Sequence, residues 1–356
     1  MAYLELNREA LAHNYQFLAD HFHKNQKHWG VVTKVLCGHK TYLEEVLKLH
    51  TGTVFDSRLS NLKAIRKLQP ETRTVYIKPP PKRIIPKLLE VADVSFNTQL
   101  STIRLINEEA IRQDKIHQII IMIEMGDLRE GVMRDDILDF YANVFELSNI
   151  EVIGLGTNLN CLNGVMPSYD KLIQLSLYKE LIEATFHQKI EWVTAGTSVV
   201  FPLLEQGLVP TGMNHFRMGE TLYFGNNLIT GEPLPGMRQD VFRLYAEIVE
   251  IMEKPEGLDQ PTGVNAAGVT PDADQFERGR TRNRALIDTG LLDIHYDNLK
   301  PVLQDLSVEG ASSDMLVVDV GNNDTNLNTG NHIAFQVNYM GLLSLMNSRY
   351  IEKKLL

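Results

Sequence analysis

Only two cysteines, Cys37 and Cys161, occur among the 356 residues of this sequence. Two cysteines are too few for the disulfide framework of a secreted protein, and these two do not have the spacing of metal ligands. We therefore expect no metal site. Because a free cysteine most often behaves as a small apolar residue, both are expected to fill space in the core, and the alternative is that they are thiols of a functional site.

Long apolar runs and excess positive charge are also lacking. No segment approaches the roughly 18 apolar residues of a membrane-spanning helix, and residues 1–7 contain no cationic stretch followed by an apolar one. The net charge of −10 disfavours nucleic acids and anionic membranes as partners. These features predict a cytoplasmic protein that binds neither nucleic acid nor membrane.

Apolar residues are plentiful, and their pattern indicates an α/β fold. Strand-like apolar segments alternate with amphipathic helical segments through the first two thirds of the chain. The strand-like segments lie at residues 31–34, 52–56, 74–78, 91–96, 117–124, 151–156, 191–195 and 215–217. Continuous apolar strands separated by helices indicate a parallel sheet covered on its faces. Eight such units predict a closed (β/α)8 barrel of the TIM type, with a doubly wound open sheet as the alternative.

A second domain is expected because 356 residues exceed the size at which a single core usually stops growing. From about Gly236 proline and glycine become frequent, and short β-rich segments replace the helical periodicity. We therefore predict a barrel domain over residues 1–235 and a mostly β domain over residues 236–356.

A lysine stands where the first predicted strand ends. The β-branched residues Val31–Thr33 lead to Lys34, and Gly38 breaks the segment soon afterwards. An amine held against an apolar strand loses hydration, which lowers its pKa and improves it as a nucleophile towards carbonyls. We interpret Lys34 as a Schiff-base lysine, and the alternative is a lysine that merely reaches out to solvent. Polar residues at the other strand ends favour the first interpretation, because barrel active sites form there.

Two segments near the last predicted strands could hold an anion. Thr197 and Ser198 stand between a strand and a helix, where free amides, the helix dipole and two hydroxyls could bind a phosphate, although a simple helix cap is an equal alternative. Arg217 ends the last strand, and Gly219 permits a close approach of the backbone. A Schiff-base lysine combined with a phosphate site fits pyridoxal 5'-phosphate (PLP).

Six motifs distributed over nearly the whole chain occur together. They are the strand with Lys34, Glu-Met-Gly-Asp-Leu-Arg-Glu-Gly at 124–131, Gly-Thr-Asn-Leu-Asn-Cys at 156–161, Phe-Arg-Met-Gly-Glu at 216–220, Ser-Ser-Asp at 312–314 and Asn-Tyr at 338–339. This set resembles the alanine-racemase-like, fold-type III PLP enzymes, most closely their ornithine-racemase branch. The resemblance implies a PLP-dependent amino-acid racemase and a homodimer in which the β domain of one subunit closes the barrel mouth of the other.

The resemblance also implies roles for matching positions. Lys34 would bind the cofactor covalently and act as one catalytic base, Arg129 would approach the phenolic oxygen, and Arg217 would face the pyridine nitrogen. Asn158 would face the ring, and the remaining positions would contact the phosphate. The full set of implied cofactor-binding residues is Lys34, Arg129, Asn158, Thr197, Ser198, Arg217, Gly219, Glu220 and Tyr339.

The second catalytic base cannot be carried over from the family. The tyrosine that serves in alanine racemases corresponds here to Leu291. Inverting an α-carbon requires a proton-transferring group on each face, and Lys34 reaches only one. Asp314 and His295, which lie in matching segments of the β domain, are the candidates. The alternatives are that Asp314 binds the substrate's ammonium or orients a loop, and that His295 is an exposed loop residue.

The predicted reaction interconverts the L and D forms of an amino acid by removing and returning the α-proton. A basic amino acid such as ornithine is the expected substrate, and Asp127, Glu130 or Asp314 could pair with its cationic side chain. One alternative is a racemase for alanine or another neutral amino acid. Another is a non-catalytic PLP-binding protein, which the second domain disfavours because such a protein has no need to cover a barrel mouth.

Overall fold

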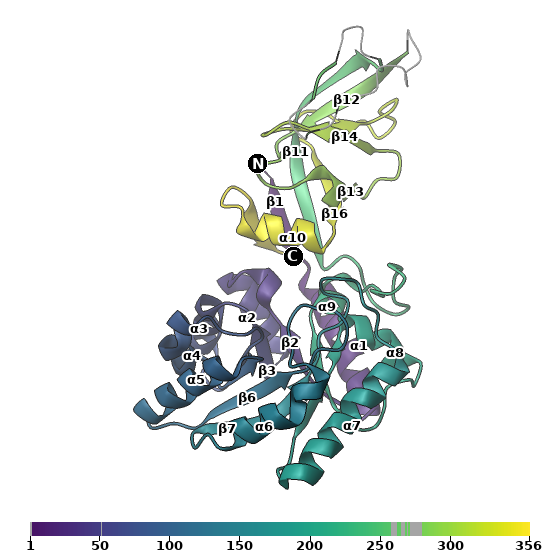
Figure 1. The fold of residues 1–356 in the computed structure, drawn as a ribbon. Helices are drawn as coiled ribbons and strands as arrows, with labels where there is room; N and C mark the ends of the chain where they lie inside the picture. Colours follow the sequence, from purple (N-terminus) through teal and green to yellow (C-terminus); the bar gives the residue numbers. More distant parts are fainter. Residues whose placement is uncertain (1, 51, 258–261, 265–267, 269, 271–279) are drawn as a thin grey trace. The chain divides into compact units, whose positions relative to one another are not determined.

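The computed structural model describes residues 2–50, 52–257, 262–264, 268, 270 and 280–356 (Figure 1). The chain divides into two compact units. One comprises Ala12–Met237, and the other comprises Met1–Leu11 together with Arg238–Leu356.

The unit Ala12–Met237 contains a parallel sheet that curves into a nearly closed barrel. Its strands are β2 (His28–Val32), β3 (Thr53–Asp56), β4 (Arg73–Tyr76), β5 (Val94–Asn97), β6 (His117–Met122), β7 (Ile150–Gly156), β8 (Trp192–Thr194), β9 (Gly196–Thr197) and β10 (His215–Met218). Strands β2 to β8 pair in chain order, and β10 pairs with both β2 and β9. Only Ala195 separates β8 from β9, so these two short strands count as one interrupted strand. The nine strands therefore form eight positions around the barrel, and the predicted eight-stranded barrel is confirmed.

Helices accompany the strands of the barrel. They are α1 (Arg8–Lys24), α2 (Lys40–Leu49), α3 (Leu59–Leu68), α4 (Ile85–Val91), α5 (Leu100–Arg112), α6 (Ile137–Phe145), α7 (Tyr169–Phe186), α8 (Phe201–Glu205) and α9 (Glu220–Phe224). In α5 the residues Ile103, Ile106 and Ala110 are buried, which is the helical spacing of an apolar face turned to the sheet. In the described part of the chain, no helix is long and apolar enough to cross a membrane.

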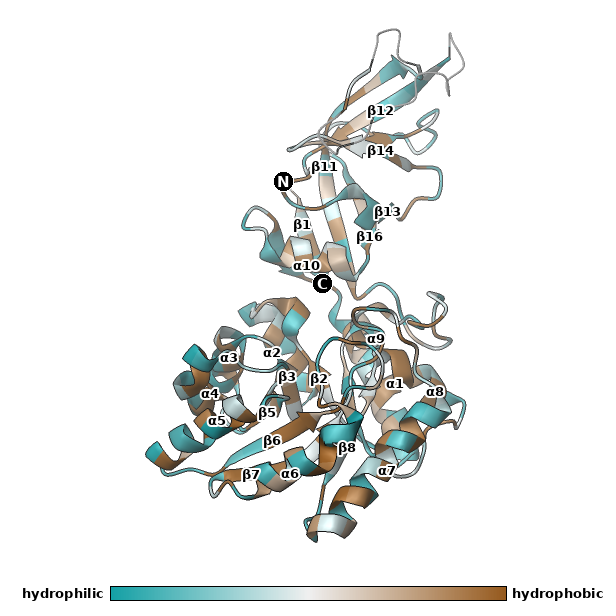
Figure 2. Ribbon diagram, in the orientation of Figure 1, coloured by the Kyte–Doolittle hydropathy of each residue, from teal (hydrophilic) through white to brown (hydrophobic). Residues whose placement is uncertain are grey.

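The barrel is filled by apolar side chains from neighbouring strands. One core cluster joins Phe55, Val75, Val94, Phe96, Ile120, Met122, Ile153 and Trp192, all of them buried. Figure 2 shows the carboxyl half of β6 as strongly hydrophobic, in agreement with that cluster. Gly196 permits the last strand pair, because a Cβ at this position would lie 2.2 Å from the ring of Phe216.

The second unit is a mainly antiparallel sheet. Its strands are β1 (Tyr3–Leu6), β11 (Phe242–Pro255), β12 (Thr281–Ile287), β13 (Leu299–Pro301), β14 (Ser307–Ala311), β15 (Leu316–Asp319), β16 (His332–Val337) and β17 (Glu352–Leu355). A helix, α10 (Tyr339–Asn347), follows β16, so the unit is mostly but not entirely β. The structure confirms the predicted combination of a barrel and a β domain.

The first strand belongs to the β unit although it begins the chain. β1 pairs with β11 and β17, and its buried residues Leu4 and Leu6 pack into that unit. The predicted boundary between residues 235 and 236 places these first residues with the barrel, whereas the contacts of the structure place them with the β sheet. A division made along the sequence cannot detect pairing between strands that lie so far apart in the chain.

Candidate active site

Lys34 lies just beyond the carboxyl end of β2. The strand ends at Val32, so the prediction of a strand residue is wrong: Lys34 is the first residue of a 3-10 turn, Lys34–Leu36. The turn ends at Cys37 and Gly38, which both adopt positive φ angles, 49° and 75°. The Lys34 side chain is open to solvent, yet partial burial lowers the pKa of its amine. An accessible amine with a lowered pKa is suited to attack a carbonyl.

A buried carboxylate holds the turn that carries this lysine. Asp56, at the end of β3, accepts a hydrogen bond of 2.9 Å from the hydroxyl of Thr33 and one of 3.1 Å from the amide of Asn61. The backbone N–H of Arg58 donates a third, at 2.9 Å. Burial nevertheless raises the pKa of Asp56 to about 6. The sequence marked Asp56 as a polar strand end, but nothing in it identified Thr33 or Asn61 as its partners.

Arg217 lies at the carboxyl end of β10 and is buried. Its guanidinium donates to four acceptors: 3.1 Å to Thr194 Oγ1, 3.0 Å to Asn158 Oδ1, 2.7 Å to the carbonyl oxygen of Thr157 and 3.5 Å to that of Thr194. Burial lowers the pKa of Arg217 to about 10, which leaves it charged at neutral pH. The structure thus brings together Arg217 and Asn158, two residues predicted to contact the cofactor.

A short relay of hydrogen bonds continues from Asn158 to Arg129. The Asn158 amide donates a hydrogen bond to the Glu130 carboxylate. Arg129 donates to both oxygens of the same carboxylate in a bidentate arrangement. This pairing raises the pKa of Arg129. The predicted residues Arg129, Asn158 and Arg217 therefore form one connected network across the ends of β6, β7 and β10.

Two predicted phosphate contacts also meet in space. The Ser198 hydroxyl accepts from the backbone N–H groups of Gly219 (3.4 Å) and Thr221 (3.1 Å). A Cβ on Gly219 would lie 3.2 Å from the Cβ of Val32, so the chain passes close to β2. Ser198 is the first residue of a 3-10 turn, Ser198–Val200, that runs directly into the short helix α8 at Phe201. Thr197 lies in β9, next to Ser198.

These groups suit PLP. The site combines an accessible amine with a lowered pKa, a hydroxyl and backbone amides gathered around a glycine, and a buried arginine held by four acceptors. No group of three or more His, Cys, Asp or Glu side chains within the described ranges is arranged to hold a metal ion.

Two carboxylates predicted to pair with a cationic substrate already have protein partners. Asp127 accepts from the backbone N–H groups of Leu162 (2.9 Å) and Asn163 (3.2 Å), so it anchors the loop after β7. Glu130 is occupied by the side chains of its network. Both carboxylates therefore support the protein's own structure, and their pairing with a substrate ammonium stays a prediction. The third, Asp314, lies in the β unit.

The loop anchored by Asp127 carries Cys161. This residue is exposed, with its thiol 3.4 Å from the carbonyl oxygen of Leu159, so the prediction of a core residue is wrong for Cys161. Cys37, three residues after Lys34, is half-buried, and neither cysteine forms a disulfide.

The β unit brings together the two segments considered for a second base. The N–H of Leu291 donates to the carbonyl oxygen of Ser312 and that of Leu292 to Ser313, both at 3.0 Å. Asp314 is exposed there and accepts a hydrogen bond of 2.6 Å from the Ser313 hydroxyl. His295 is also exposed, 3.4 Å from the carboxylate of Asp297. The catalytic roles of both residues remain predictions.

Tyr339, the last predicted phosphate contact, is the first residue of α10. Asn338 caps this helix, and its side chain accepts a hydrogen bond of 2.8 Å from the N–H of Gly341. The role of Tyr339 also remains a prediction.

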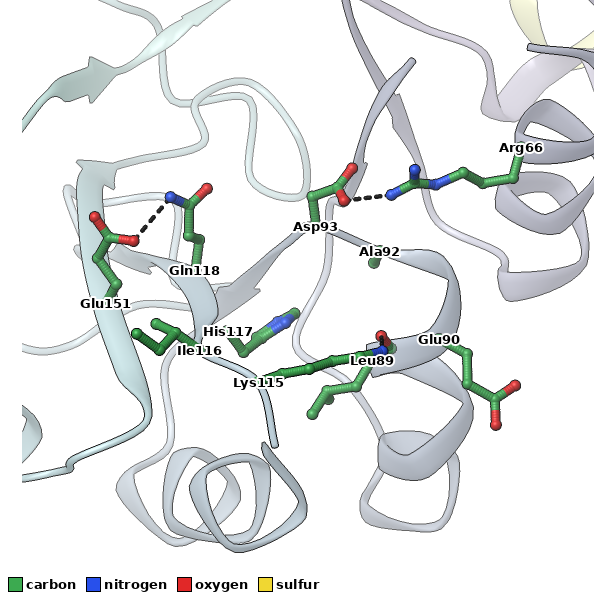
Figure 3. A pocket seen from close by; sticks show the side chains of 10 residues that line it. All are labelled: Arg66, Leu89, Glu90, Ala92, Asp93, Lys115, Ile116, His117, Gln118 and Glu151. Carbon is green, nitrogen blue, oxygen red and sulfur yellow. Dashed lines mark hydrogen bonds and ion pairs between the residues drawn. The ribbon is translucent and has the colours of Figure 1, made fainter. Parts of the chain in front are cut away.

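A hollow of about 460 Å3 lies at the other end of the barrel strands, near the starts of β5, β6 and β7 (Figure 3). Most of its charged side chains have partners within the protein: Arg66 contacts Asp93, Lys115 donates to the carbonyl oxygen of Leu89, and Glu151 accepts a hydrogen bond of 2.8 Å from Gln118. Buried His117 bonds Ser95 at 2.9 Å, and burial lowers its pKa to about 4. Because these groups satisfy one another, the hollow lacks the reactive character of the Lys34 end.

Comparison with known proteins identifies the family. Residues 6–227 match the family model of the alanine racemase N-terminal domain. The chain belongs to this family. It is 32% identical to an ornithine racemase of Acetoanaerobium sticklandii over 354 residues, which is 99% of this chain and 98% of that protein. It is also 29% identical to a lysine racemase of Thermotoga maritima, over 90% of this chain and 89% of that protein.

The fold of this alanine racemase family member is shared with solved structures. One is the alanine racemase from Bartonella henselae with covalently bound pyridoxal phosphate, with a TM-score of 0.75 at 16% identity, covering 100% of this chain and 99% of that one. The resemblance predicted from the motifs is confirmed, and the chain is an amino-acid racemase.

Proposed function

We propose that this racemase uses PLP bound to Lys34 and acts on a basic amino acid such as ornithine. The observation that carries the proposal is the accessible Lys34 amine, whose pKa burial lowers, at the strand end next to the Ser198 and Gly219 cluster. The similarity over nearly the whole chain to an ornithine racemase, and over most of it to a lysine racemase, supports a basic substrate.

Bound PLP would withdraw electrons from the α-carbon of an attached amino acid and so make its α-proton removable. Lys34 would accept and return that proton at Nζ on one face, because its lowered pKa leaves the amine uncharged more often than in an ordinary lysine. Arg217 carries only N–H donors, so it can donate to a ring nitrogen but cannot protonate it fully. Ser198 and the amide of Gly219 would bind the phosphate.

The opposite face requires a second group, and we propose Asp314 or His295 supplied by the partner subunit of a homodimer. Both are exposed in the β unit, and Tyr339 of the same unit would add a phosphate contact. Sedimentation analysis would reveal the dimer. We also propose a cytoplasmic location, which the two free thiols support.

The decisive experiment is reduction of the PLP-loaded protein with borohydride, followed by peptide mass spectrometry and a chiral assay over a panel of L-amino acids. We expect the label on Lys34 and racemisation of ornithine. Lys34→Ala should abolish both, whereas Lys78→Ala, which removes another lysine with a lowered pKa, should retain them. A label elsewhere would refute the site. Racemisation of alanine alone would favour a neutral substrate, and bound PLP without racemisation would favour a PLP-binding protein.

A further inference from the structure

Glu220 lies next to the segment that carries Lys34. Strands β10 and β2 run parallel with Met218 opposite Val31, and a Cβ on Gly219 would lie 3.2 Å from the Cβ of Val32. The residues that follow on each strand therefore leave the barrel side by side. On one side they lead to Lys34, and on the other to Glu220, the first residue of α9.

The Glu220 side chain is half-buried, and no partner within the described residues explains its position. Its side chain makes no hydrogen bond or ion pair in the part of the chain that the structure describes. Burial raises its pKa, and the positive charge of Lys34 opposes that rise. A half-buried carboxylate without hydrogen bonds destabilises the fold unless a cation or a donor meets it during function.

Each of the other carboxylates at this end of the barrel accepts hydrogen bonds from the protein. Asp56 accepts from Thr33, Asn61 and a backbone N–H; Glu124 accepts from the N–H of Leu128 at 3.1 Å; Asp127 and Glu130 hold the loop and the arginine network described above. Among these five carboxylates, Glu220 is the one that accepts no hydrogen bond from the described residues.

The position of Glu220 is also unfavourable for binding phosphate alone. It follows Gly219 directly, and an acidic side chain beside amides that hold a phosphate dianion is repelled by it. A cation placed between them would remove that repulsion. The cationic end of a basic amino acid attached near Lys34 supplies such a charge, whereas alanine does not.

We propose that Glu220 binds the side-chain ammonium of the substrate and sets the preference for basic over neutral amino acids. This inference rests on the proposed function, because it requires a substrate attached near Lys34. Its test compares ornithine with norvaline, which has the same carbon chain without the terminal amine.

The variant Glu220→Gln keeps the size of the side chain and removes its charge. We expect the ratio of kcat/KM for ornithine to that for norvaline to fall about tenfold or more, because a charge-assisted hydrogen bond is lost. Glu220→Asp, which keeps the charge on a shorter arm, should retain part of the preference. The control is Glu90→Gln, an exposed glutamate of α4 at the opposite end of the strands, which should leave the ratio unchanged.

A second readout does not depend on turnover. α-Methylornithine and α-methylnorvaline have no α-proton, so their equilibrium affinities for the PLP-loaded protein can be measured by calorimetry. Glu220→Gln should weaken the first about tenfold or more and leave the second nearly unchanged. If Glu220→Gln does not retain PLP, the same affinities are measured on Glu220→Met instead. Loss of PLP from both variants would assign Glu220 to cofactor binding and so overturn the proposal.

The remaining outcomes separate this inference from the proposed function. An ornithine-to-norvaline ratio that stays within twofold of the wild-type ratio in Glu220→Gln overturns the role of Glu220, as does a wild-type protein that prefers norvaline. A wild-type protein that carries no PLP on Lys34 contradicts the proposed function itself.

Discussion

Arg217 donates a hydrogen bond of 3.0 Å from Nη1 to Oδ1 of Asn158. Arg217 belongs to strand β10, and Asn158 lies in the segment after β7. The bond between them fixes the orientation of the Asn158 amide. With its oxygen occupied by Arg217, the amide presents its N–H2 group to Glu130, which in turn holds Arg129. One buried cation therefore orders three further polar side chains at the carboxyl ends of the strands.

Replacing Arg217 by lysine should disrupt this order. A lysine keeps the charge but presents one compact ammonium instead of a planar fork, so it cannot reach Asn158 Oδ1, Thr157 O and Thr194 Oγ1 in the present geometry. We expect kcat to fall roughly tenfold to a hundredfold, in line with the loss of one charged hydrogen bond. The absorbance spectrum of the bound cofactor should shift as well. A variant with the wild-type rate and spectrum would show that the fork is not required.

Asp56→Asn tests the buried carboxylate below Lys34. Burial raises the folded-state pKa of Asp56 to about 6 from an unfolded value near 3.8. The protonated form therefore stabilises the folded state, and that contribution is complete below pH 4 and lost as the pH rises through 6. Relative to Asp56→Asn, the wild type should lose up to about 3 kcal/mol of unfolding free energy between pH 4 and pH 7.

Urea denaturation of both proteins at several pH values measures this difference. Because asparagine does not titrate, all other groups contribute equally to the two curves and cancel. A difference that stays constant from pH 4 to pH 7 would mean that Asp56 titrates near its ordinary value.

The second proton-transferring group is tested by Asp314→Ala and His295→Ala. A protein that lacks this group should still exchange the α-proton of one enantiomer with solvent deuterium, because Lys34 remains, yet it should no longer racemise. Mass spectrometry of the recovered substrate and chiral chromatography distinguish the two activities. If both variants racemise at the wild-type rate, neither residue is the second base, and the exposed thiol of Cys161 becomes the next candidate.

Local patterns in the sequence were sufficient to predict the architecture. Alternating apolar strands and amphipathic helices predicted the barrel, and the change in composition near Gly236 predicted the β-rich unit, since both signals depend on neighbouring residues. The motifs around Lys34, Arg217 and Ser198 predicted an active site at the carboxyl ends of the strands, and the structure brings Ser198 to Gly219 and Arg217 to Asn158.

Tertiary structure decided what depends on contacts between distant segments. It places Lys34 in a turn, whereas the sequence predicted a strand. It also pairs β1 with β11 and gives Asp127 and Glu130 protein partners. It also showed that the Glu220 carboxylate, near the charge of Lys34, accepts no hydrogen bond from the described residues. The sequence by itself determined which polar groups lie at the strand ends. Only the folded chain decided which of them are satisfied, because a hydrogen bond joins residues by their distance in space and not by their order in the chain.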